Sequence, residues 1–186
     1  MILGLIAFLL ALFFAIIKPK VMKLFIAILA VSSGLILFEQ KGQIPVHGAS
    51  KNDWNEDSYW YEPWGASIVH RGIDIFGDKG QAILATNSCF VLLAREIKVG
   101  GNAIVCLDTA LKLHYFAHLD SITTESYSFV SGGTKIGTLG DSGNAKGKQP
   151  HLHYSVMSVI PRPWNITGQT LGWMRMFYID PNTLWD

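Results

Sequence analysis

Histidine is the side chain best placed to do chemistry in this sequence, and five of its six histidines fall into three short patterns. The patterns are HRGID at 70–74, HYFAHL at 114–119 and PHLHY at 150–154. Imidazole nitrogen and carboxylate oxygen are common zinc ligands, and a catalytic zinc site uses three protein ligands and leaves a position for water. The patterns therefore predict a metal site assembled from segments far apart in the chain.

Strand geometry limits how these side chains can share an ion. In an extended strand the Cα atoms of His70 and Asp74 would lie roughly 13 Å apart at ~3.3 Å per residue, which is far for one ion. We therefore expect the backbone to bend near Gly72, where glycine makes a bend less costly. His151 and His153 share one face of a strand, so one can bind the metal while the other stays near the water.

Other readings of these residues remain open at this point. A single H-x-H or H-x-x-x-D pair is also typical of surface or hydrogen-bonded core histidines, and only the combination favours a metal site. His118, from a third strand, can supply a further imidazole beside the open position. For His47 and His114 we expect no functional role. Four acids are expected to be turn residues: Asp78, Asp108, Asp120 and Asp141.

The elements that position these residues read as short strands. From about residue 60, runs rich in Val, Ile, Phe and Tyr alternate with Gly, Asn, Asp and Ser, without a long amphipathic helix. We predict a mainly β fold built on an antiparallel sheet, with a flexible loop at 140–150 and with Ile73 and Ile75 in the core. The expected strands are 68–75, 82–85, 89–97, 103–107, 112–118, 135–139 and 153–159.

The tryptophans and cysteines carry further expectations. Trp164, Trp173 and Trp185 are expected to close the C-terminal part of the core. Cys89 and Cys106 lie opposite each other if a hairpin turns near residues 97–101, which favours a disulfide in an oxidising compartment. Two buried free thiols are the alternative.

The N-terminus differs from the rest of the chain because residues 1–17 carry no charge and 21–38 carry only Lys23. We predict a membrane anchor of one or two transmembrane helices within 1–38, a linker at 39–59 and one domain at 60–186. Lysines at 18, 20 and 23 should stay on the cytoplasmic side, which delivers the domain outside the cytoplasm. A signal sequence starting at Met22 would also export it, whereas a buried helix pair is the soluble alternative.

The charge of the domain argues against one class of partner. Four of the fifteen basic residues precede residue 50, so the remainder has eleven basic and thirteen acidic residues. A domain without a basic footprint is not expected to bind nucleic acid. The sequence leaves the oligomeric state open.

Five stretches of the domain agree in order and spacing with a known family. They are HRGIDI at 70–75, GGNAIVCL at 100–107, YFAHLDSI at 115–122, VSGGTKIGTLGDSGNA at 130–145 and PHLHYSV at 150–156. Over residues 60–159 the chain thus resembles the lysostaphin/LytM-type zinc endopeptidases, which cut peptide bonds in bacterial cell-wall peptidoglycan. The resemblance implies an antiparallel β-sheet domain with a substrate groove.

The resemblance also implies residue roles. It makes His70, Asp74 and His153 the ligands of one Zn²⁺, and it makes His118 and His151 the catalytic pair. The implied activity is hydrolysis of peptide cross-links between peptidoglycan stem peptides. The predicted anchor and the short linker, rather than the resemblance, favour a domain on the periplasmic side of the inner membrane.

Two positions depart from the family's pattern, and two other functions compete. Phe116 stands where a tyrosine is frequent, with Tyr115 one step earlier, and Ser155 stands where a glutamate is frequent. Neither changes the five key residues. The main alternative is a non-catalytic LytM-type binding module that activates cell-wall amidases. Zinc storage or sensing is a third reading, although a storage site needs no spare imidazoles.

Overall fold

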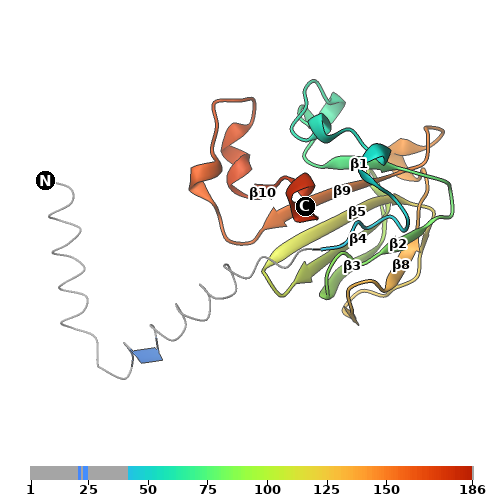
Figure 1. Ribbon diagram of the computed structural model, residues 1–186, viewed down its shortest axis with the longest axis horizontal. Helices are drawn as coiled ribbons and strands as arrows, with labels where there is room; N and C mark the ends of the chain where they lie inside the picture. Colours follow the sequence, from blue (N-terminus) through green and yellow to red (C-terminus); the bar gives the residue numbers. More distant parts are fainter. Residues whose placement is uncertain (1–20, 22, 25–41, 186) are drawn as a thin grey trace, which may run out of the picture. The chain divides into compact units, whose positions relative to one another are not determined.

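The computed structural model describes residues 21, 23, 24 and 42–185 (Figure 1). The chain divides into two compact units, Met1–Glu39 and Gln40–Asp186. The expected membrane anchor at 1–38 lies outside the described residues except at three positions. Within the described part of the chain, no helix is long and apolar enough to cross a membrane.

The second unit is built on two antiparallel sheets, as the mainly β prediction required. The larger sheet has the order β1-β9-β5-β4-β3-β7, with β10 also paired to β9, and the smaller has the order β2-β8-β6. The strands are β1 (Ile73–Phe76), β2 (Ala82–Leu84), β3 (Cys89–Ile97), β4 (Gly101–Asp108), β5 (Lys112–Leu119), β6 (Ser121–Ile122), β7 (Phe129–Val130), β8 (Lys135–Thr138), β9 (His151–Ser158) and β10 (Tyr178–Ile179).

Helical structure between residues 42 and 185 is limited to short 3-10 segments. They are η1 (Lys51–Asp53), η2 (Glu56–Ser58), η3 (Gly65–Ser67), η4 (Gly143–Ala145), η5 (Pro163–Asn165), η6 (Gly172–Met176) and η7 (Pro181–Leu184). All of them lie in connections or in the segments before β1 and after β9, outside the two sheets.

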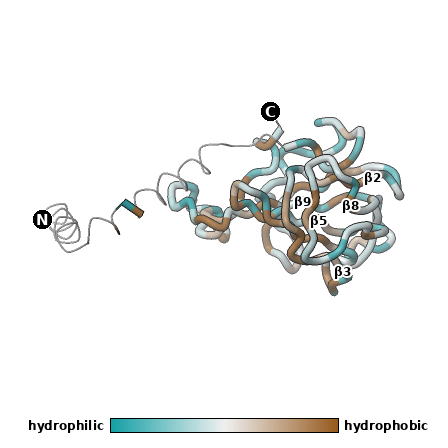
Figure 2. The backbone as a smooth tube through the Cα atoms, turned by 90° about the horizontal axis from the view of Figure 1, so that it is seen from below, coloured by the Kyte–Doolittle hydropathy of each residue, from teal (hydrophilic) through white to brown (hydrophobic). Residues whose placement is uncertain are grey.

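Strand β9 shows why the sequence forms this sheet. Its residues alternate between two faces, as side chains in a strand must. Leu152, Tyr154 and Val156 are buried in the hydrophobic core, which joins residues from both sheets. In Figure 2 the central strands β5 and β9 run through hydrophobic parts of the unit. The opposite face of β9 is left for His151 and His153.

The first expected strand is shorter than predicted, because β1 begins at Ile73 rather than at residue 68. The backbone of His70 is paired with the preceding chain instead: its N–H donates to Tyr61 O (2.9 Å) and its carbonyl accepts from Trp60 N (2.7 Å). The chain therefore bends between residue 70 and β1. Ile73 and Ile75 are fully buried, as expected.

Residues 42–59, expected to be part of a linker, pack on the sheets. Val46 forms a bridge with Ile83 of β2, and both side chains are buried. Trp54 is also buried, and its Nε1–H donates to Asn182 Oδ1 (2.9 Å). The polar composition of the segment conceals these anchors, because they are single apolar residues without a strand or helix period.

The expectation for the C-terminal tryptophans is wrong for two of the three. Trp164 and Trp173 are 78% and 57% exposed. Trp185 does pack in the core, with ring contacts to Trp54 (5.9 Å between centroids) and Tyr154 (5.6 Å).

The cysteine prediction is confirmed. Cys89 on β3 and Cys106 on β4 form a disulfide, with Cα atoms 5.7 Å apart. The two strands are adjacent and antiparallel, as the expected hairpin required.

Candidate metal centre

Three neighbouring strands bring the predicted site residues together. Asp74 on β1 and His153 on β9 are direct cross-strand partners, and Ala117 on β5 is the partner of His153 on the other side. Directly opposed residues of antiparallel strands have their side chains on the same face of the sheet. The sheet register therefore places a carboxylate beside an imidazole, with His118 one residue beyond Ala117.

Three ligand atoms converge at this point. His70 Nε2 lies 3.1 Å from Asp74 Oδ1 and 3.0 Å from His153 Nδ1, and the last two atoms lie 2.9 Å apart. A tetrahedral ion with bonds of about 2.0–2.1 Å separates its ligand atoms by about 3.3 Å, so only a slight widening admits one. His70, Asp74 and His153 are the group in the described chain whose ligand atoms could hold a metal ion.

His70 is oriented by residues upstream of β1. Its Nδ1–H donates to the carbonyl oxygen of Ser58 (2.9 Å), which leaves the lone pair of Nε2 for the site. Trp64 stacks on the imidazole, with centroids 4.0 Å apart and planes inclined by 20°. Such partners fix the tautomer and ring orientation of a ligating histidine. Sequence reasoning missed both residues, since a backbone acceptor and a stacked ring leave no motif.

The electrostatics of Asp74 suit a metal ligand. Burial by itself would raise the pKa of this carboxyl, but hydrogen bonds with His153 and His70 outweigh burial and hold the pKa well below its usual range. The carboxylate is therefore ionised at neutral pH. Ligands bind metals in their deprotonated forms, so the donor set of two imidazoles and one carboxylate fits zinc.

Gly72 is required for space rather than for an unusual backbone angle. A Cβ at this position would lie 2.5 Å from Tyr154 O and 3.1 Å from His153 Cε1. Its φ lies outside the left-handed region in which glycine is favoured. The sequence correctly marked Gly72, but the physical reason is the close approach of the bend to β9.

His118 and His151 lie beside this group and face each other, with ring centroids 5.1 Å apart. His118 Nδ1–H donates to Ser142 O (3.0 Å), and His151 Nδ1–H donates to Gln149 O (2.8 Å). Because a carbonyl can only accept, both imidazoles carry their proton on Nδ1. Each Nε2 is left as an acceptor with no hydrogen-bond partner in the described part of the chain.

The environment keeps His118 neutral. Burial, together with the neighbouring His151 and His153, lowers its pKa to about 4. The backbone is also unusual, because His118 has φ 68°, in the left-handed region that β-carbon sterics disfavour. Backbone strain of this kind often marks functional positions.

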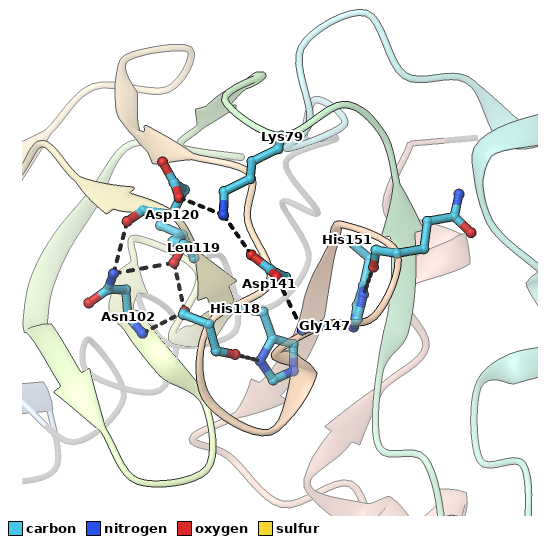
Figure 3. A network of polar contacts seen from close by, with 10 residues as sticks. Lys79, Asn102, His118, Leu119, Asp120, Asp141, Gly147 and His151 are labelled. Atoms are coloured by element: carbon cyan, nitrogen blue, oxygen red, sulfur yellow. Dashed lines mark hydrogen bonds and ion pairs between the residues drawn. The ribbon is translucent and has the colours of Figure 1, made fainter.

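The loop at 140–150, expected to be flexible, is anchored at several points (Figure 3). Lys79 forms ion pairs with Asp141 (2.8 Å) and Asp120 (3.3 Å), and Asp141 accepts from Gly147 N (3.2 Å). Ser142 Oγ donates to Leu119 O (2.6 Å). These contacts hold the carbonyl of Ser142 against His118.

A cleft of about 260 Å³ opens onto the group, lined among others by Trp64, His118, His153 and Tyr115. Tyr115 contacts the ring of His153 edge-on, with centroids 6.1 Å apart. Phe116 is fully buried and packs on the core face instead. The strand alternation of β5 could have identified Tyr115 as the phenol that faces the cleft.

The remaining predictions concern His47, His114 and the acids expected in turns. His47 is exposed and lies away from the group. His114 is buried in a separate network: it contacts Asp108 Oδ2 (3.1 Å) through Nε2 and Tyr154 Oη (2.6 Å) through Nδ1. Asp108 is a turn residue as expected, because Oδ1 accepts from Lys112 N, but it is also the buried partner of His114.

Comparison with known proteins fits this geometry. The family model described as Peptidase family M23 matches residues 68–165, which is more than half of the chain and includes all five predicted site residues. The chain belongs to peptidase family M23.

Relatives of this chain in the M23 family include both an activator and an endopeptidase. The murein hydrolase activator NlpD of Salmonella dublin is 35% identical over 105 residues, covering 55% of this chain and 27% of that protein. The L-Ala--D-Glu endopeptidase of Bacillus subtilis is 31% identical over 115 residues, covering 57% and 35%. The chain thus spans about a quarter to a third of the length of these relatives.

The structure of the M23 domain is also similar to solved ones. The catalytic domain of lysostaphin from Staphylococcus simulans aligns with a TM-score of 0.50 and 27% identity, covering 54% of this chain and 76% of that one. The resemblance to lysostaphin-type peptidases inferred from the sequence is therefore confirmed at the level of family and fold.

Proposed function

We propose that this chain is a zinc-dependent endopeptidase that hydrolyses peptide cross-links in bacterial cell-wall peptidoglycan. The observation that carries the proposal is the convergence of His70 Nε2, Asp74 Oδ1 and His153 Nδ1 next to two imidazoles with unpartnered Nε2 atoms. A structural metal site is closed, whereas this one adjoins a cleft.

In this proposal His70, Asp74 and His153 hold one Zn²⁺, which when bound supplies Lewis acidity and lowers the pKa of a coordinated water. His118 is neutral above about pH 4, so its Nε2 accepts a proton from the attacking water. His151 Nε2 faces the same space, where the pair can return the proton to the leaving amine. Tyr115 lines the cleft and orients the substrate peptide.

A non-catalytic module that activates cell-wall amidases is the second candidate. It is favoured by one observation: the relatives 34–35% identical to this chain are named murein hydrolase activators. Binding alone does not require a complete metal triad or two free imidazoles. The retention of all five side chains in one constellation supports the enzyme.

The deciding experiment is digestion of defined cross-linked muropeptides by the zinc-loaded chain, with products identified by mass spectrometry. We expect His118→Ala and His151→Ala to keep stoichiometric zinc and to lose at least about a hundredfold in kcat, the usual contribution of general acid–base catalysis. His70→Ala should lose zinc, and His47→Ala is the matched control. If the His118 and His151 variants both cleave at the wild-type rate, the assigned roles are refuted. If the wild-type chain cleaves nothing but binds an amidase tightly, the non-catalytic module is favoured.

We further propose that the domain works outside the cytoplasm and is held at the inner membrane by residues 1–38. The Cys89–Cys106 disulfide supports this location, because disulfides persist in oxidising compartments. Thiol alkylation in intact cells, with a cytoplasmically retained chain as the control, checks it. Free thiols in the full-length chain in cells would contradict export.

A further inference from the structure

A second cleft, of about 360 Å³, lies in the segment that follows β9, and we call it the C-terminal cleft. Its walls include Tyr59, Arg162, Trp164, Arg175, Tyr178 and Asp180. The family match ends at residue 165, so most of this segment lies outside the part shared with the family.

The cleft carries an excess of positive charge. Arg175 is held in place, since its Nη1–H donates to Gln169 Oε1 (2.7 Å) and its guanidinium lies 5.4 Å from the ring centre of Tyr59. The one acid, Asp180, uses Oδ1 to accept from the backbone and side-chain nitrogens of Asn182 (3.0 and 2.8 Å). The lining therefore contains two arginines and one acid, and the carboxylate of that acid already accepts hydrogen bonds.

Arg162 provides donors that no described protein group occupies. Its guanidinium has no hydrogen bond, ion pair or ring contact with any residue that the structure describes, whereas its backbone N–H is fixed to Met176 O (2.7 Å). A guanidinium presents its N–H groups in a planar fork that matches a carboxylate. Trp164, two residues later, is 78% exposed on the same cleft and offers an uncovered aromatic surface.

The two clefts share a wall. Tyr178 on β10 lines both the metal-side cleft and the C-terminal cleft. Arg71, which lines the metal-side cleft, has its guanidinium 5.8 Å from the ring centre of Tyr178. The two clefts are therefore adjacent, and the side chain of Tyr178 borders both of them.

We propose that the C-terminal cleft is a carboxylate-binding subsite, in which Arg162 and Arg175 hold a free carboxylate of the peptide substrate and Trp164 packs on the chain beside it. This inference rests on the proposed function, because the occupant is the substrate of the metal-side cleft. The proposal assigns substrate selection to the segment that follows β9. It predicts a preference for peptides that carry a free carboxylate next to the cleaved bond.

The test compares two cross-linked stem-peptide substrates, one with free carboxylates and one in which they are converted to amides. The wild-type zinc-loaded chain should show a KM about tenfold lower for the free acid, as expected for one charge-assisted fork, with similar kcat values. Arg162→Gln should remove that preference by raising KM for the acid substrate only. Arg162→Lys should restore it in part, and the exposed Arg95→Gln is the control for net charge.

A direct binding measurement separates this inference from the proposed function. Quenching of tryptophan fluorescence by the acid peptide, compared in wild type and Trp164→Phe, reports occupancy without turnover. If wild type cleaves neither substrate but still binds the acid peptide in an Arg162-dependent way, the endopeptidase proposal fails and the subsite stands. If Arg162→Gln has wild-type KM and binding for both peptides while retaining its fold and zinc content, the subsite is refuted.

Discussion

At the residue scale, the site depends on the tautomers of its histidines. His70, His118 and His151 each donate Nδ1–H to a backbone carbonyl, which directs Nε2 toward the site. His153 contributes through Nδ1 instead. Backbone carbonyls are reliable orienting groups because their position follows from the main chain and they cannot donate. The chemistry is therefore set by the segments that present these carbonyls.

Gly72→Ala should weaken the metal site, because the substitution pushes the bend before β1 away from β9. The added Cβ would collide with Tyr154 O and crowd His153, so the bend and β9 must separate. We expect at least a tenfold loss of zinc affinity, the scale seen when the groups supporting metal ligands are disturbed. Zinc titration with a competing chelator measures it. Gly168→Ala, whose Cβ would meet nothing within 4 Å, is the control, and equal affinities of the two variants would contradict the steric argument.

Replacing His118 should separate its function from its strain. Its φ of 68° costs an L-residue about 1–2 kcal/mol, and glycine avoids that cost. We expect His118→Gly to be more stable than His118→Ala by about 1 kcal/mol, with a similar loss of kcat on muropeptides in both variants. Denaturant unfolding of the two zinc-free proteins gives the comparison. A less stable glycine variant would show that the backbone at this position is not strained.

At the element scale, adjacency of β1, β9 and β5 builds the site on one face, while a buried polar network lies on the other. Asp108, His114 and Tyr154 join the turn after β4 to β5 and β9. Burial alone would raise the pKa of Asp108, but hydrogen bonds from His114 and from the backbone of Lys112 hold the pKa below its ordinary value. A buried network of this kind ties neighbouring strands in one register.

Asp108→Asn should destabilise the fold in a pH-dependent way. A carboxyl whose folded pKa is depressed contributes stability above its unfolded pKa of about 3.9, and that contribution is lost as pH falls through the folded value. We expect a loss of about 1.5–3 kcal/mol at pH 7, the range for hydrogen bonds to charged groups. Unfolding of wild type and variant from pH 7 to pH 2 measures it. The difference in unfolding free energy between wild type and variant should become smaller below about pH 4. A difference that stays constant with pH would argue against ionisation of Asp108 as the cause.

At the scale of the whole molecule, the segment that precedes β1 in the sequence packs against the segment that follows β9. Trp54, before β1, is hydrogen-bonded to Asn182 and contacts Trp185, both after β9. Trp60 Nε1–H donates to Thr170 O (3.1 Å) in the same way. These contacts connect the segment that orients His70 with the segment that forms the C-terminal cleft.

Trp54→Ala should therefore lower both stability and zinc affinity. Removing a buried tryptophan typically costs about 3–5 kcal/mol, whereas the exposed Trp173→Ala should stay within about 0.5 kcal/mol of wild type. We expect weaker zinc binding as well, because the carbonyl of Ser58 is four residues from Trp54 and orients His70. Thermal unfolding and zinc titration of both variants check this. Unchanged zinc affinity in a destabilised Trp54 variant would confine its role to the core.

The sequence by itself determined the sheet class, most strand bounds and the five candidate site residues, and it favoured the cysteine pairing without excluding two free thiols. These follow from local alternation, turn residues and motif spacing, which are properties of short segments. Tertiary structure alone decided which groups orient those residues: Ser58 behind His70, the carbonyls facing His118 and His151, and the exposure of Trp164. Such contacts join backbone groups and single side chains across long separations, and no local period records them. For the same reason a segment with the composition of a polar linker proved to be part of the domain, and a C-terminal segment without a motif forms most of the C-terminal cleft.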